Sequence, residues 1–215
     1  MPRRSLTPLA FAAFTAVVSI GLLWAAIASG WLGPDVGRGD GFCEAARDAL
    51  IEQPANTLSN GGFVVAGLVI GWHAGDPRRT IAENPTLATA YAMIVVLLGP
   101  ASAAMHATQS AAGGHLDLLS MYLIAAFAFG YAATRLLRRG TGTFALLWLV
   151  AIAACEAVER IPGHVPVVDA WANLAFGLLL VAAAVGEALL WRRGVSVRNP
   201  RWGLAAVGAM GLAFA

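Results

Sequence analysis

The stretch TLATAYAMIVVLLGPASAAMH, residues 86–106, decides the fold class. It runs for 21 residues without an Asp, Glu, Lys or Arg. A helix of about 20 apolar residues spans the hydrocarbon core of a bilayer, which is about 30 Å thick. Proline removes a helical hydrogen bond and kinks a helix, and Gly99-Pro100 stands just before Ser102 and His106. We therefore expect a membrane-spanning helix that opens near one end and carries polar groups there.

Other apolar runs of similar kind flank this one. They lie at 8–29, 56–75, 117–137, 143–158 and 168–191. The whole chain is 59% hydrophobic and 12% charged, with a mean hydropathy of +0.71, whereas soluble domains carry about a quarter charged residues. The sequence predicts an all-α, polytopic transmembrane helix bundle. It has no basic tract, which argues against nucleic acid as a partner, and its two cysteines form no disulfide framework or zinc motif.

The first apolar run has two interpretations. Arg3 and Arg4 precede it and it ends in AIAS, which looks like a signal-peptide cleavage site. The run of about twenty residues exceeds a usual signal core, so we favour a retained helix. We expect residues 1–30 to form an N-terminal transmembrane helix or signal anchor, and 31–215 the main transmembrane domain. The topology is the same in either case.

Arginine placement predicts the orientation, since cytoplasmic loops are enriched in basic residues. With a cytoplasmic N-terminus, three arginines fall outside and the other eleven of the 14 fall inside. The outer three are Arg38, Arg47 and Arg160, and the acidic segment 30–55 and the segment 107–116 also face outwards. All the basic residues are Arg, which indicates a GC-rich, bacterial genome. We expect a multi-pass protein of a bacterial inner membrane.

A polar constellation follows from this topology. Ser102 and His106 are four residues apart and share one face of a helix. Asp117 begins the next apolar run, so it can return to face His106. Ionisable groups at membrane depth are costly and usually functional, although Asp117 could instead cap its helix. A Ser sharing its turn with the His is poorly placed as a nucleophile, so a metal ligand is the better role for His106.

Three motifs around this constellation carry a family resemblance. FCEAARDALIEQPANTLSN (42–60), SAAMH (102–106) and HLDLLSMY (115–122) resemble the alkaline ceramidases, integral membrane amidases. The resemblance implies a seven-helix core, here preceded by one additional helix. It implies hydrolysis of the amide bond of ceramide or a related N-acyl lipid, releasing a sphingoid base and a fatty acid.

The same resemblance implies the site residues. His106 matches one of three zinc-binding histidines, the other two belonging to an H-x-x-x-H pair on the last helix. Asp117 matches the acid that works with the zinc-bound water, and Ser102 matches a serine beside the metal. Zinc would lower the pKa of its water to about 7, and the carboxylate would move the proton. Glu44 matches a calcium ligand, and Asp40 is shifted by one residue from another.

The sequence departs from the family pattern in two respects. It has no H-x-x-x-H pair and its final apolar run, 203–215, has only thirteen residues. We therefore expect a C-terminally truncated product that lacks the last core helix, so the chain as it stands could be inactive. At the calcium positions, Gln53 replaces a carboxylate, and Gly41 and Ala46 replace other ligands. The acidic loop could equally be a solvated face.

Other classes of function remain open. A non-enzymatic or degenerate membrane protein, such as a transporter or a lipid-binding protein, would keep the fold without the chemistry. A transporter could use Asp117 and His106 as a proton relay, but no internal inverted repeat is evident. A haem carrier could use His73 and His106, although the predicted topology separates them across the membrane. Zinc content or a haem absorption band would separate these classes.

Overall fold

The structure is a computed structural model that describes residues 4–76, 84–166 and 169–194. In chain order its elements are α1 (Thr7–Ser29), α2 (Pro54–Ser59), α3 (Gly61–Ala74), α4 (Pro85–Thr108), α5 (Ala111–Leu136), α6 (Thr141–Glu159), β1 (His164–Val165), β2 (Asp169–Ala170) and α7 (Trp171–Arg192). The two strands are a short antiparallel pair between α6 and α7. The predicted all-α helix bundle is confirmed.

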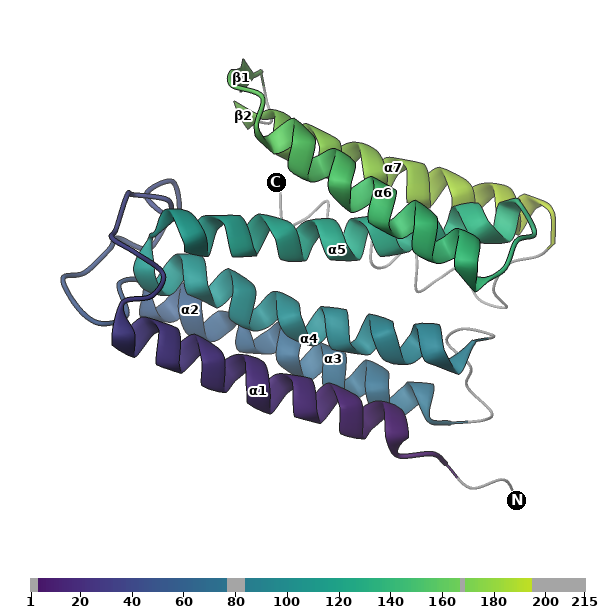
Figure 1. Cartoon of the computed structure of the whole chain (residues 1–215), viewed down its shortest axis with the longest axis horizontal. Coiled ribbons are helices and arrows are strands. Elements are labelled where there is room, and N and C mark those ends of the chain that lie inside the picture. The colour runs from purple at the N-terminus through teal and green to yellow at the C-terminus, as the bar shows by residue number, and fades with distance from the viewer. Residues whose placement is uncertain (1–3, 77–83, 167–168, 195–215) are drawn as a thin grey trace.

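The helices form two groups that meet along α4 and α5 (Figure 1). α1 and α3 pack on α4, whereas α6 and α7 pack on α5. In its most apolar stretch, α4 has 61% of its residues buried, against 17% for α6 and for α7. α4 is therefore the centre of the bundle, and the outer helices turn most of their apolar surface away from the protein, as lipid-facing helices do.

Five helices of the described residues are long and apolar enough to cross a membrane: α1, α4, α5, α6 and α7. This makes the chain a multi-pass membrane protein. The prediction of a single spanning helix at 56–75 was wrong, because the chain forms α2 and α3 with a turn at Asn60. α3 alone has 14 residues, and at 1.5 Å per residue it is about 21 Å long. The predicted run 203–215 lies outside the described residues.

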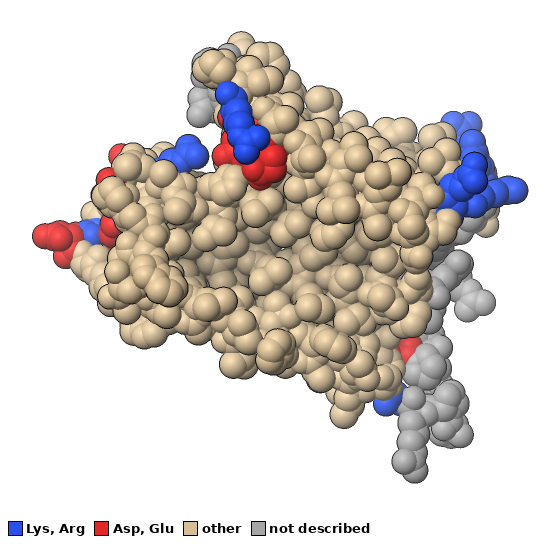
Figure 2. All heavy atoms as spheres, viewed as in Figure 1, with Lys and Arg blue, Asp and Glu red and all other residues tan. Residues whose placement is uncertain are grey.

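The two ends of the bundle differ in charge (Figure 2). The arginine end contains five arginines, in the last turn of α5 and of α7 and directly after these helices: Arg135, Arg138, Arg139, Arg192 and Arg193. The loop end contains the segment 30–53, the α4–α5 connection and the strand pair between α6 and α7. Asp35, Asp40, Glu44, Asp48 and Glu52 all belong to the loop end. This separation agrees with the sides predicted for these residues.

α3 packs closely against α4 at Gly67. A Cβ atom added to Gly67 would lie 2.5 Å from Val96 Cγ2, 2.7 Å from the Val96 backbone nitrogen and 2.8 Å from the Ala92 carbonyl oxygen. Val96 and Ala92 are fully buried. Small residues let helix backbones approach in this way inside membranes. Gly67 therefore sets the separation of α3 from α4.

We expect Gly67→Ala to destabilise the bundle by about 2 kcal/mol, because the added methyl group must push two backbones apart. The measurement is the thermal unfolding midpoint of the purified chain in detergent. Gly62→Ala is the matched control, since a Cβ at Gly62 meets nothing within 4 Å. That variant should keep the wild-type midpoint, and equal midpoints for both variants would contradict the assigned packing.

Candidate functional site

Ser102, His106 and Asp117 come together at the loop end of the α4–α5 pair. Ser102 and His106 lie one turn apart on α4 and are 8% and 6% exposed. Asp117, on α5, is half-buried, and its carboxylate lies near the Ser102 hydroxyl. It also lies close enough to the His106 ring for an electrostatic interaction. A hydroxyl, an imidazole and a carboxylate thus form one cluster, which we call the α4–α5 cluster.

The α4–α5 connection is much shorter than predicted. The sequence suggested a loop at 107–116, but only Gln109 and Ser110 separate the two helices. Gln109 adopts a left-handed conformation with φ of 48°, and the Ser110 hydroxyl accepts the Gly113 N–H at 3.0 Å. Ser110 is therefore the N-cap of α5. Asp117 lies in the second turn, so capping does not explain its presence.

His106 is held in one tautomer by Gln53. The Gln53 side-chain nitrogen donates to the carbonyl oxygens of Gly39 at 3.0 Å and Glu44 at 2.6 Å. This fixes the amide orientation, so its oxygen faces His106 Nδ1 at 2.7 Å. Since an amide oxygen only accepts, Nδ1 carries the proton and Nε2 keeps its lone pair. Nε2 is therefore free to bind a metal ion or to accept a proton.

The segment 30–53 is fastened over the end of α4 by backbone hydrogen bonds. The Gln109 carbonyl oxygen accepts from the N–H groups of Val36 and Arg38, both at 3.1 Å. The carbonyls of His106 and Ala107 accept from Gln53 and Glu52, also at 3.1 Å. The last carbonyls of a helix have no partner within it, so this segment caps α4. It also covers the site.

Aromatic packing completes the cover. The Phe42 ring meets the His106 ring edge to face, with centroids 4.7 Å apart and an interplanar angle of 78°. Phe42 itself is 50% exposed at the surface. The imidazole is consequently shielded by an apolar side chain that stands at the boundary of the molecule.

Glu44 and Asp40, the two residues predicted as calcium ligands, make different interactions in the structure. Both Glu44 carboxylate oxygens accept backbone N–H groups at the start of α2, from Ala55 at 3.0 Å and Asn56 at 2.7 Å. Asp40 is exposed, and its carboxylate lies close enough to Glu52 to interact with it electrostatically. Glu44 is thus an N-terminal cap of α2, a role that Gln53 supports by binding the Glu44 carbonyl. Calcium remains a prediction.

The pKa values of the loop carboxyl groups shift in opposite directions. The Asn56 and Ala55 N–H groups hold the pKa of Glu44 below its ordinary value, and Arg47 adds to this effect. Burial raises the pKa of Glu52, and the nearby carboxylates of Asp35, Asp40 and Asp48 raise it further. Glu44 therefore stabilises the folded segment above its ordinary pKa and ceases to do so as the pH falls through its lowered value. The pKa of Glu52 is raised, so its ionised carboxylate destabilises the folded segment, and protonation removes this effect as the pH falls.

We expect the segment 30–53 to loosen in acid through Glu44. An environment-sensitive dye on Cys43, which is exposed, reports this loosening in a Glu52→Gln background that removes the opposing group. The signal should change as the pH falls below the ordinary glutamate pKa of about 4.5 and through the lowered pKa of Glu44. Adding Glu44→Gln should abolish the transition, since the amide does not titrate. An unchanged acid transition in that double variant would assign the effect to another group.

The metal-binding capacity of the α4–α5 cluster is limited. His106 and Asp117 offer one imidazole and one carboxylate, whereas catalytic zinc sites use three protein ligands. Among the described residues, one set of three His, Cys, Asp or Glu ligands lies close together, and it includes neither His106 nor Asp117. The residues outside the described ranges add no His or Cys. The side chains that the structure describes at the α4–α5 cluster therefore do not fit a three-histidine zinc centre.

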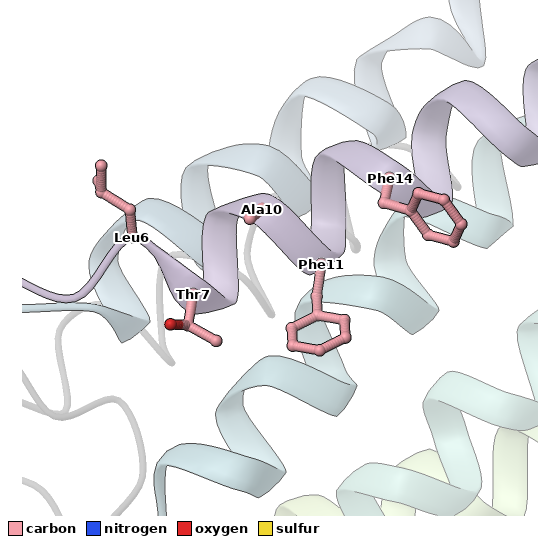
Figure 3. Close-up of a pocket in the computed structure, with 5 residues that line it drawn as sticks. All are labelled: Leu6, Thr7, Ala10, Phe11 and Phe14. Atoms are coloured by element: carbon pink, nitrogen blue, oxygen red, sulfur yellow. The ribbon is translucent and has the colours of Figure 1, made fainter.

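Two other features lie away from this cluster. His73 is at the arginine end of α3, where its Nδ1 meets the Val69 carbonyl at 2.8 Å. It cannot share a haem with His106, which lies at the loop end. An apolar groove lies along the first half of α1, lined by Leu6, Thr7, Ala10, Phe11 and Phe14 (Figure 3). No ionisable group lines it, so it offers no reactive group.

Gln53 and Gln109 are the positions that sequence reasoning missed. Both side chains are fully buried, and each fastens the segment 30–53 to the end of α4. In the sequence, Gln53 was noted only because it replaces a carboxylate at a position of the expected calcium site. A glutamine directly before Pro54 and another directly before the Ser110 cap were the signals available. Neither signal indicates which distant residue the amide will bind.

Comparisons with known proteins give no relative. No protein-family model matches the chain, and no curated protein or solved structure matches it either. The function must therefore be argued from the residues of the site.

Proposed function

We propose that this protein is an intramembrane hydrolase that cleaves the amide bond of ceramide or a related N-acyl lipid to a sphingoid base and a fatty acid. The observation that carries the proposal is the α4–α5 cluster: a carboxylate near a hydroxyl, beside an imidazole with an unprotonated Nε2. These groups lie at the end of an apolar bundle, where the amide of a membrane lipid would be found. The reaction class, amide hydrolysis, is taken from the resemblance of three sequence motifs to the alkaline ceramidases.

Each group has a role that suits its chemistry. Asp117 would accept a proton from the attacking water and return it to the departing nitrogen, which is general acid–base catalysis. The water oxygen bonds to the carbonyl carbon as the C–N bond breaks. The Ser102 hydroxyl would turn from Asp117 to donate a hydrogen bond to the developing oxyanion. His106 Nε2 would orient the water, and Gln53 would keep that ring in place.

Zinc is implied only by the resemblance to the alkaline ceramidases. The α4–α5 cluster does not supply the three protein ligands that a catalytic zinc ion needs. When bound in such a hydrolase, zinc activates water and polarises the carbonyl. Here His106 Nε2 is the one imidazole ligand that the α4–α5 cluster offers. The catalytic roles are therefore assigned to Asp117, Ser102 and His106 themselves. No catalytic step is assigned to calcium either.

The orientation and compartment form part of this proposal. The basic residues of the arginine end favour a cytoplasmic location for that end and for the N-terminus. The α4–α5 cluster would then face the outer leaflet of a bacterial inner membrane. Thiol labelling of Cys43 in intact cells tests this orientation, since Cys43 is exposed at the loop end.

The test of the proposed function is hydrolysis of a fluorescent ceramide analogue by the chain reconstituted in lipid nanodiscs. His106→Ala should abolish release of the labelled fatty acid. His73→Ala, the matched control at the arginine end, should retain it. Equal turnover by wild type and His106→Ala would refute the proposal.

The incomplete ligand set favours one alternative, a lipid-binding membrane protein that keeps the fold without the reaction. Its signature would be saturable binding of the same analogue with no product, and binding that depends on His106 or Asp117. A transporter would instead move its cargo across the bilayer without changing it.

A further inference from the structure

A second cluster of metal-binding side chains lies on another face of α5. His115 on α5 meets two glutamates one turn apart on α6. His115 Nε2 is 3.7 Å from a Glu156 carboxylate oxygen, and Nδ1 is 3.5 Å from a Glu159 oxygen. One ligand atom from each of the three residues lies within 4.8 Å of the other two. We call this the α5–α6 cluster.

The α5–α6 cluster is separate from the α4–α5 cluster. His115 and Asp117 are two residues apart on α5, and residues at this spacing point to different faces of a helix. Asp117 lies near Ser102 and His106 on α4, whereas His115 contacts α6. Acidic side chains come to the surface near the loop end of α6 (Figure 2). The inference below is therefore independent of the proposed function.

Two carboxylate oxygens of this cluster are buried without a partner. Glu156 Oε1 and Glu159 Oε2 are inaccessible to solvent and make no hydrogen bond to the described residues. A buried oxygen that lacks a partner costs roughly 1–3 kcal/mol, and more when it is charged. His115 offers one ring nitrogen to each glutamate, so it leaves these second oxygens unsatisfied.

Tyr122 supplies an independent sign of a missing partner. Its side chain is 0% exposed, and its hydroxyl has no hydrogen bond within the described part of the chain. Tyr122 packs against Cys155 of α6, and its hydroxyl interacts electrostatically with Glu159 and Glu156. Buried tyrosine hydroxyls usually find a partner, and a metal-bound water would provide one here.

We propose that His115, Glu156 and Glu159 bind a divalent transition-metal ion, Zn²⁺ or Mn²⁺, that joins α6 to α5. An imidazole with two carboxylates is a donor set that both ions accept. Ligand atoms about 2.1 Å from a tetrahedral ion lie about 3.4 Å apart. The three ligand atoms, within 4.8 Å of one another, would therefore have to close in by at most about 1.4 Å to bind one ion. His115 is 45% exposed, which leaves a route for the ion from water.

The test is metal content of the full chain in detergent, stripped with a chelator, reloaded with Zn²⁺ and freed of excess ion. Wild type should retain about one equivalent that Glu156→Gln/Glu159→Gln loses, since the amides keep the shape but not the charge. His106→Ala should retain it, which separates this site from the α4–α5 cluster. Equal zinc in wild type and the double glutamine variant, or none in wild type, would overturn the proposal.

A second measurement is the absorption spectrum of Co²⁺ bound to the wild-type chain. Co²⁺ bound to an imidazole and two carboxylates in a four- or five-coordinate site gives visible absorption that hydrated Co²⁺ lacks. The wild-type spectrum should show it, and added Zn²⁺ should remove it. Zn²⁺ should also raise the thermal midpoint of wild type but not that of His115→Ala. A spectrum of hydrated Co²⁺ alone would mean that His115 and the glutamates form only an ion pair.

Discussion

Asp117→Asn should lower turnover of a ceramide analogue at least about a hundredfold while leaving the protein folded. Asparagine has nearly the same shape and keeps a side-chain oxygen near the Ser102 hydroxyl. It cannot take a proton from water, and positioned acid–base groups contribute about 10²–10⁴ to rates. The measurement is release of labelled fatty acid from nanodiscs under saturating substrate, with the thermal midpoint as a check on folding.

Asp48→Asn is the matched control for Asp117→Asn. Asp48 is an exposed carboxylate in the segment 30–53, on the same end of the molecule. The substitution removes the same charge without touching the α4–α5 cluster, so turnover should stay near that of wild type. Turnover of Asp117→Asn within about tenfold of wild type would show that Asp117 does not move the proton.

Gln53→Leu should give the largest loss of stability, about 3–5 kcal/mol. The Gln53 amide is fully buried and binds the carbonyls of Gly39 and Glu44, the His106 ring and the Asn56 side chain at 3.2 Å. Leucine has similar volume but leaves these groups unpaired, and each buried group left unpaired costs roughly 1–3 kcal/mol. The thermal midpoint and protease cleavage of the segment 30–53 measure the effect.

Gln53→Glu separates the stability role of Gln53 from its effect on His106. The carboxylate still accepts from Nδ1 but cannot donate to the Gly39 and Glu44 carbonyls. The variant should lose stability and yet keep the His106 tautomer, which ¹⁵N NMR of the ring reports. Gln53→Leu should lose both. Wild-type stability in Gln53→Leu would show that the amide network has no structural role.

The spanning helices were predictable because lipid imposes a simple rule. In lipid, the backbone N–H and C=O groups of a long apolar run must hydrogen-bond to one another, so such a run forms a helix. Five of the predicted runs correspond to helices of the structure: 8–29, 86–106, 117–137, 143–158 and 168–191. The run 56–75 followed the same rule but breaks at Asn60, ahead of Gly61 and Gly62. The proximity of Ser102 and His106 followed from helical spacing alone.

The remaining features depend on contacts between distant segments. Ser110 could not be distinguished from a loop serine by sequence, but its hydroxyl caps α5, which places His115 inside the helix and moves Asp117 from the start of the helix to its second turn. His115 meets Glu156 and Glu159 only because α6 packs back on α5. The Gln53–His106 hydrogen bond joins residues 53 positions apart. No local pattern encodes such a pair.

The most direct test of the central claim is the chemical fate of an N-acyl lipid given to the purified wild-type chain in water enriched in ¹⁸O. If the α4–α5 cluster performs amide hydrolysis, mass spectrometry will find a free sphingoid base and a fatty acid carrying one solvent-derived oxygen. Recovery of the intact lipid, bound or unbound, would contradict the account, and lipid binding would remain as the function only if the intact lipid were bound.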